Sequence, residues 1–297
     1  MSDIPHVTLN NGLSMPQLGL GVWQARGTEV VDAVTAAIDS GYRLIDTAAI
    51  YGNESEVGEA IRASSVAREE LFVTTKLWNS DQGYDNAKRA FDKSLERLGL
   101  DYVDLYLIHW PAPKLDKYVE TWQALEEIYE SGRAKAIGVC NFHVQHLEKL
   151  MANAKVTPAI NQIELHPRLA QHEIREYCVS KNIQVESWSP IGGSGGNLLN
   201  DPVIHDIASK HNRTAAQIII RWHIQSGLVV IPKSVHVDRI KQNADVFDFA
   251  LDDNDMKKIA QLNTGERRGP NPEKMDSRVG TGIGQFAHKL NLVRFRK

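Results

Sequence analysis

The chain has 297 residues, enough for two ordinary domains or for one barrel of about 250 residues with insertions. Its hydrophobic content of 42% and charged content of 24% are ordinary for a globular protein, and its net charge of −3 gives no reason to expect nucleic acid as a partner. The N-terminus lacks a basic flank before an apolar run, and the apolar runs are too short to span a bilayer, so we expect no signal peptide and no membrane segment. Two cysteines in a chain this long are not a disulfide framework, and a cytoplasmic protein is expected.

The first predicted element is a small hairpin. Residues 7–9 and 14–18 flank Asn11-Gly12, a pair that supplies the positive φ angles of a tight turn. A short strand is expected over 17–23. Residues 28–41 have apolar side chains at helical spacing, with Thr28 suited to be the N-cap and Gly41 to end the helix.

Strand-like and helix-like segments then alternate along almost the whole chain. Further strands are predicted over 43–46, 71–77, 102–109, 134–139, 159–165, 183–190 and 228–232. Helices are predicted over 55–64, 84–99, 119–132, 143–154, 171–182, 202–211, 214–226, 237–243 and 252–262. An open doubly wound sheet and a closed barrel both fit this α/β series. Its regularity, with no linker, favours a single (β/α)8 TIM barrel with an N-terminal β-hairpin and extra C-terminal helices.

The end of the chain differs in composition from the rest. No acidic residue follows Asp276, and five basic residues do, so residues 1–276 carry 29 basic and 37 acidic side chains, a net charge of −8. We expect residues 1–276 to form the single barrel domain. Residues 277–297 are a tail that is either a native C-terminal loop or an expression-derived or divergent extension.

Four polar residues fall at or just past the ends of three successive predicted strands: Asp46, Tyr51, Lys76 and His109. In a (β/α)8 barrel the active site lies at these carboxyl ends. A tyrosine has a pKa of about 10, and a neighbouring ammonium lowers it by favouring the phenolate. Lys76 is therefore suited to tune Tyr51 as an acid, with Asp46 holding the ammonium. His109 is suited to donate a hydrogen bond to a substrate carbonyl.

Each of these residues alone is more often structural or solvated than functional. Because all four occur together at three successive strand ends, a functional role is much better supported for the group than for any one residue alone. The segments GYRLIDTAAIYGNE, TTKLW, LGLDYVDLYLIHWP and IPKSV closely resemble the aldo-keto reductase superfamily, in the right order over roughly residues 6–276. The resemblance is to the bacterial branch of 2,5-diketo-gluconate reductases and morphine dehydrogenase-like members. It implies that Asp46, Tyr51, Lys76 and His109 are the catalytic tetrad, with Tyr51 as proton donor.

No G-x-G-x-x-G segment lies between a strand and a helix, which disfavours a Rossmann domain. The segment IPKSVHVDRIKQN instead follows the last strand and opens a helix, where Lys233 and Arg239 suit a phosphate monoester. The simpler alternative is that these basic residues are solvent-exposed at the start of a helix and bind no ligand. The resemblance implies that this segment binds the 2′-phosphate of NADPH, through Lys233, Ser234, Val235, Arg239 and Asn243. It departs at His236, where relatives often have arginine; this weakens the preference for NADPH without reversing it, since Lys233 and Arg239 remain.

The resemblance also implies a nicotinamide pocket in which Asn141 and Gln162 bind the carboxamide and Trp188 stacks on the ring. Cys140 stands where the family often has serine, which is a stronger hydrogen-bond donor. Trp23, Trp78 and Trp110 follow strands and are expected to line the substrate pocket, with Ile50 and Asn79 as less certain members. Core packing is the alternative for each tryptophan. The histidines are scattered, and no metal is expected.

The sequence therefore predicts an NADP-dependent oxidoreductase that reduces aldehydes and ketones with NADPH, possible activities including that of a 2,5-diketo-gluconate reductase. Small-molecule carbonyls are the expected partners, and a monomer is expected. One alternative is an NAD(P)-dependent dehydrogenase of secondary alcohols. The other is a barely catalytic barrel that senses NADPH.

Overall fold

Eight parallel strands form one closed sheet in the computed structural model, which describes residues 4–193 and 196–276. The strands pair in chain order: β3 (Gly19–Gly21), β4 (Leu44–Asp46), β5 (Phe72–Leu77), β6 (Val103–Ile108), β7 (Ala134–Cys140), β8 (Ile160–Glu164), β9 (Gln184–Trp188) and β10 (Val229–Val230). Parallel bridges from Leu18 to Val230 and from Gly21 to Lys233 join the last strand to the first. These bridges close the barrel that the alternation of segments predicts.

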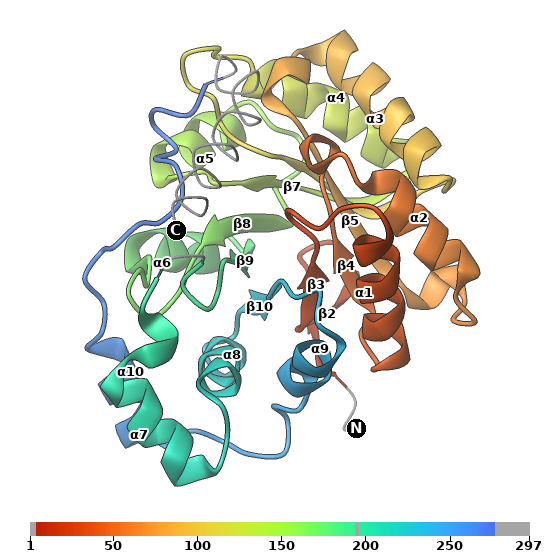
Figure 1. Ribbon diagram of the computed structural model, residues 1–297. Helices are drawn as coiled ribbons and strands as arrows, with labels where there is room; N and C mark the ends of the chain where they lie inside the picture. The colour runs from red at the N-terminus through yellow and green to blue at the C-terminus, as the bar shows by residue number, and fades with distance from the viewer. Residues whose placement is uncertain (1–3, 194–195, 277–297) are drawn as a thin grey trace, which may run out of the picture.

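Helices surround the strands (Figure 1). They are α1 (Thr28–Asp39), α2 (Glu54–Ala63), α3 (Tyr84–Leu98), α4 (Tyr118–Glu130), α5 (Val144–Met151), α6 (His172–Ser180), α7 (Pro202–His211), α8 (Ala215–Gln225), α9 (Val237–Ala244) and α10 (Asp253–Ala260). The additional helices α7 and α10 pack on each other beside α8, outside the regular strand–helix alternation. The (β/α)8 barrel with extra helices is thus confirmed.

Side chains alternate between two hydrophobic layers, because successive residues of a strand point to opposite faces. In β6, Leu105 and Leu107 pack inside the barrel, whereas Tyr106 and Ile108 pack outward against the helices. All six residues of this strand are buried. This explains why the strand is continuously apolar apart from Asp104, as expected for strands covered on both faces.

The N-terminal hairpin closes one end of the barrel. Strand β1 (His6–Thr8) pairs antiparallel with β2 (Ser14–Pro16), and Leu9 and Met15 belong to the interior layer. The hairpin is confirmed, but its turn differs from a two-residue Asn-Gly turn. Only Gly12 has a positive φ, of 84°, and the Gly12 amide donates to the Leu9 carbonyl at 2.9 Å. A three-residue loop with glycine in the left-handed region has this geometry.

The start of α1 also differs from its prediction. Thr28 is the first helical residue, and Gly27 is the N-cap, without a side-chain hydrogen bond. Gly41 does have the positive φ, 86°, expected after a helix end. In the described residues, no helix has both the length and the apolar character needed to cross a membrane. The single domain over 1–276 stays a prediction, and the tail 277–297 lies outside the described residues.

Candidate active site

A buried ion pair lies at the carboxyl ends of β4 and β5. The Lys76 ammonium donates to Asp46 Oδ1 at 2.6 Å and to the Thr47 carbonyl at 2.9 Å. Lys76 is fully buried and Asp46 is 2% exposed. Burial lowers the pKa of Lys76, but Asp46, together with Tyr51 and Cys140, more than offsets this, and the net pKa lies above its ordinary value. Lys76 is therefore a fixed positive charge.

Tyr51 lies above this charge, on the short 3₁₀ helix Ala49–Tyr51 that follows β4. The Lys76 Nζ is 5.2 Å from the centre of the Tyr51 ring. The loop is held by Asn53, which accepts a hydrogen bond from Thr47 Oγ1 at 2.7 Å and donates to the Val22 carbonyl at 3.0 Å. Burial raises the pKa of Tyr51, and Lys76 opposes this only in part. Lys76 thus acts in the predicted direction, but burial outweighs it, and Tyr51 is protonated at neutral pH.

His109 follows β6 and faces Tyr51, with 5.8 Å between the ring centres. Burial and the nearby Lys76 both lower the pKa of His109, well below its ordinary 6.5. The imidazole is therefore neutral at pH 7. It can offer or accept a hydrogen bond, but it holds no extra proton to deliver. Tyr51 is the better acid of the two.

Gln162 on β8 links Asp46 to a second buried carboxyl group. Its Nε2 donates to Asp46 Oδ2 at 2.8 Å and to Glu186 Oε2 at 2.9 Å. Burial, with a further contribution from Asp46, raises the pKa of Glu186 to about 8. Glu186 is thus mostly protonated at neutral pH. The sequence reasoning missed this residue, although an acidic side chain within the strand 183–190 was a usable signal.

Asn141 follows β7 and has the positive φ of 66°. Its Nδ2 donates to the His109 carbonyl at 3.0 Å, and its Oδ1 accepts from the Trp188 indole at 2.9 Å. Nδ2 also lies 3.1 Å from the sulfur of Cys140, which is a weak acceptor. The structure therefore places Asn141 and Trp188 in contact beside the tetrad.

Of the five predicted pocket residues, Trp78, Trp110 and Ile50 meet in one cluster, Trp23 lies apart from it, and Asn79 is buried. Trp78 and Trp110 are each 5% exposed and pack in one cluster with Met275, against which Ile50 and Trp188 also lie. Trp78 is 5.2 Å from His109 between ring centres. Trp23 is 46% exposed and is not part of this cluster. Asn79 is buried, and both polar atoms of its side chain lack a hydrogen-bond partner within the described chain.

The predicted phosphate site lies after β10, at the start of α9. Lys233 and Arg239 are exposed, and neither forms an ion pair within residues 4–193 and 196–276. Ser234 and Asn243 are each 7% exposed, and Val235 is half-buried. The N-cap of α9, His236, makes no side-chain cap, so the first amides of the helix stay available.

This donor set fits NADPH. Two unpaired cations beside uncapped helix amides suit a phosphate monoester. At the other end, one Asn141 proton faces the Cys140 thiol, and Gln162 Oε1 has the same sulfur, 3.6 Å away, as its one side-chain partner among the described residues. Asn141 Nδ2 and Gln162 Oε1 can therefore replace these weak interactions with the sulfur by hydrogen bonds to a carboxamide. Cys140 itself is buried, and burial raises its pKa well above the ordinary value, so it is no nucleophile.

The C-terminal segment crosses the barrel mouth next to Trp188. The buried carboxylate of Glu164 accepts from the backbone amides of Arg268 and Gly269, at 2.6 and 2.9 Å. A Cβ at Gly269 would overlap the Trp188 ring. Only glycine fits this close approach. Neither Glu164 nor Met275 had a signal in the sequence, because the contacts of Glu164 with Arg268 and Gly269, and of Met275 with Trp78 and Trp110, join segments more than 100 residues apart.

Residues 17–264 match the aldo/keto reductase family. The chain is 55% identical to glyoxal reductase of Bacillus subtilis (strain 168), covering 91% of this chain and 96% of that protein. It is 53% identical to morphine 6-dehydrogenase of Pseudomonas putida, covering 92% and 96% respectively. A mutant of Gox0644 solved in complex with NADPH is 46% identical, with a TM-score of 0.88, and the match covers 93% of this chain and all of that one.

These matches confirm the resemblance that the motifs indicate, and they span nearly the full length of each relative. The chain belongs to the aldo/keto reductase family and is an NADP-dependent oxidoreductase that acts on carbonyl groups.

Proposed function

We propose that this enzyme reduces small aldehydes and ketones with NADPH, and that Tyr51 delivers the proton. The observation that carries the proposal is the buried Lys76–Asp46 pair beneath Tyr51, with the neutral His109 facing the same phenol. A reduced carbonyl becomes an alkoxide unless it receives a proton. Tyr51 faces His109 and is protonated at neutral pH, so it can supply this proton.

The four side chains divide the work. His109, kept neutral by burial, binds the carbonyl oxygen by a hydrogen bond and orients it toward Tyr51. As negative charge develops on that oxygen, Tyr51 donates its phenolic proton. The Lys76 ammonium stabilises the resulting phenolate, and Asp46 keeps the ammonium in place. Solvent then returns a proton to the phenolate.

The remaining proposed residues hold the cofactor, and bound NADPH supplies the hydride from nicotinamide C4. Trp188 presents its indole to the ring, while Asn141 and Gln162 bind the carboxamide. Lys233 and Arg239, with Ser234, Val235 and Asn243 around them, bind the 2′-phosphate. The exposed cations at this end are what favour NADPH over NADH.

Small dicarbonyls are the proposed substrate class. The relative named glyoxal reductase supports this, as does an apolar cluster of Trp78 and Trp110 directly beside His109. Reduction of 2,5-diketo-gluconate is a narrower form of the same proposal. A second candidate is oxidation of secondary alcohols with NADP⁺, supported by the relative named morphine 6-dehydrogenase. The same residues catalyse this oxidation, in which the Tyr51 phenolate accepts the proton of the alcohol as a general base.

The test is cofactor consumption across a panel of glyoxals, sugars and aromatic ketones, with NADPH and NADH in parallel. Turnover of dicarbonyls with NADPH supports the proposal. Faster oxidation of polycyclic alcohols than reduction of any carbonyl would favour the second candidate. NADPH binding without turnover would contradict both and favour a sensing barrel. We further propose a cytoplasmic monomer, which fractionation and sedimentation can check.

A further inference from the structure

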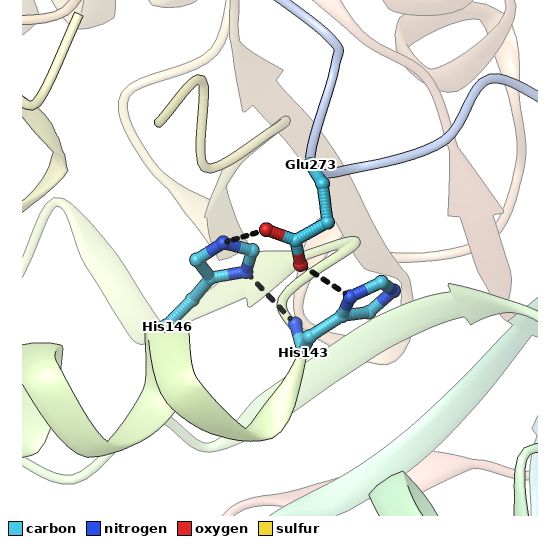
Figure 2. A group of neighbouring side chains, drawn as sticks. All are labelled: His143, His146 and Glu273. Atoms are coloured by element: carbon cyan, nitrogen blue, oxygen red, sulfur yellow. Dashed lines mark hydrogen bonds and ion pairs between the residues drawn. The ribbon is translucent and has the colours of Figure 1, made fainter. Parts of the chain in front are cut away.

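A second cluster of titratable side chains lies away from the tetrad, where the start of α5 meets the C-terminal segment (Figure 2). His143 Nδ1 is 2.6 Å from Glu273 Oε1, and His146 Nε2 is 3.4 Å from Glu273 Oε2. Gln145 also donates to Glu273 Oε1, at 2.8 Å. We call His143, His146 and Glu273 the clasp. The sequence analysis treated these histidines as scattered.

Two histidines and a carboxylate resemble a metal site, but the hydrogen bonds favour another use. His146 Nδ1 accepts the backbone amide of His143 at 3.1 Å, which caps α5. A neutral imidazole that accepts at Nδ1 carries its proton at Nε2. His146 Nε2 therefore carries a proton that faces Glu273 Oε2, 3.4 Å away. A metal at that nitrogen would displace the proton and cost α5 its cap, so the expectation of no metal stands as a prediction.

Glu273 sits on a tight turn that also carries Met275. The amides of Lys274 and Met275 both donate to the Asn271 carbonyl, at 2.9 and 3.1 Å. Glu273 faces α5, whereas Met275 is 5% exposed and packs on Trp78 and Trp110. A force that holds Glu273 therefore also holds Met275 against the aromatic cluster.

The two histidines of the clasp, at the start of α5, are held in place by their neighbours. His143 lies two residues after Asn141, whose side chain binds the His109 carbonyl and the Trp188 indole. His146 is 4% exposed, and its ring packs edge-on against Phe142. The clasp thus fastens a long C-terminal segment, blue in Figure 1, to the loop that carries the proposed carboxamide ligand.

We propose that His143 and His146 are positioning residues that, through Glu273, set Met275 as the wall of the substrate pocket and so determine its preference for small carbonyls. This inference rests on the proposed function, because it assigns the cluster of Trp78, Trp110 and Met275 to substrate. Releasing the clasp withdraws an apolar wall. Small carbonyls then lose contact area, while bulky ones gain room.

His146 also makes the start of α5 sensitive to pH. Burial lowers the pKa of His146 below 6.5; Glu273 opposes this, and His143 and Lys149 add to it. Tyr118 packs against the same ring, and Asp116 pairs with Lys149. A second proton on His146 would occupy Nδ1 and face the His143 amide. Protonation would therefore cost α5 its His146 cap, whereas the resulting cation would pair more strongly with Glu273, so the clasp stays closed at acidic pH.

The experiment compares Glu273→Ala with Lys274→Ala, an exposed neighbour on the same turn. The specificity ratio is kcat/KM for glyoxal divided by kcat/KM for a naphthyl ketone. We expect Glu273→Ala to lower this ratio about tenfold or more, mainly through the KM of glyoxal. Lys274→Ala should leave it unchanged. His146→Gln restores a neutral capping acceptor and donor, so it should keep the wild-type ratio.

Hydrogen exchange of residues 266–276 gives a readout that needs no activity. In Glu273→Ala the amides of Lys274 and Met275 should exchange faster than in the wild type. An unchanged exchange rate, or an unchanged specificity ratio in an active enzyme, would overturn the proposal. The proposal would also be overturned if the wild type bound one equivalent of Zn²⁺ tightly and His146→Ala did not. An enzyme that reduces no carbonyl yet shows the exchange difference would instead refute the proposed function and leave the clasp in place.

Discussion

Replacing Lys76 with methionine should separate the two tasks of this buried ammonium. The first task is structural: without Lys76, the Asp46 carboxylate stays 2% exposed with Gln162 as its remaining side-chain donor, at 2.8 Å. Breaking a buried ion pair from one side costs about 3–5 kcal/mol. We therefore expect Lys76→Met to lower the free energy of unfolding by that amount in a urea titration.

The second task is electrostatic. With 5.2 Å between the ammonium and the centre of the Tyr51 ring, a unit charge at an effective dielectric of about 20 stabilises the phenolate by about 3 kcal/mol. Losing it disfavours proton transfer from Tyr51 by roughly 10²-fold. Single-turnover reduction of a dicarbonyl by Lys76→Met should be slower by about that factor.

The double variant Lys76→Met/Asp46→Asn distinguishes the tasks. It removes the stranded carboxylate, so it should regain most of the lost stability without regaining the rate. Lys88→Met is the matched control, because Lys88 also lies 5.2 Å from a tyrosine ring and pairs with a carboxylate, but at the exposed surface. Its stability should change by less than about 1 kcal/mol. A double variant with wild-type rate would refute the electrostatic task.

Two further predictions concern Glu186 and the phosphate site. The pKa of Glu186 is about 8, against 4.5 for an ordinary glutamate, so the folded state holds a proton that the unfolded state loses, and stability falls as the pH rises between those values. Glu186→Gln removes this loss, and its melting temperature should exceed that of the wild type by a margin that grows from pH 5 to pH 8; a constant margin would contradict the assignment. Lys233→Ala and Arg239→Ala each remove a charge-assisted contact worth about 1.5–3 kcal/mol, so each should raise the KM for NADPH by about 10–150-fold and leave that for NADH nearly unchanged. Equal losses with both cofactors would place the 2′-phosphate elsewhere.

The barrel could be predicted from the sequence because its signals are local. Continuously apolar strands such as 102–109 alternate with amphipathic helices, and strand ends in a barrel converge wherever the helices lie. That convergence is why Asp46, Lys76 and His109 could be grouped without coordinates. Two local predictions were wrong, namely the type of turn at Gly12 and the N-cap of α1. Both depend on backbone angles that several residue types tolerate.

The rest of the site depends on contacts between distant segments. Met275 reaches Trp78 and Trp110 only because the chain after α10 returns across the barrel mouth, and Glu273 meets His143 from 130 residues away. Nothing in the composition of that segment indicates its path. The effect of Lys76 on the pKa of Tyr51 has the predicted direction, but burial, which outweighs the ammonium, cannot be read from neighbouring residues.

The most direct test of the mechanism is Tyr51→Phe, which removes one hydroxyl group and keeps the ring beside His109. NADPH binding, followed by fluorescence titration, should remain within a few-fold of the wild type, because the proposed cofactor residues are untouched. Reduction of dicarbonyls should fall by about 10²–10⁴-fold, the usual contribution of a positioned acid. Turnover close to the wild-type rate with normal NADPH binding would show that another group delivers the proton, and would contradict the assignment of Tyr51.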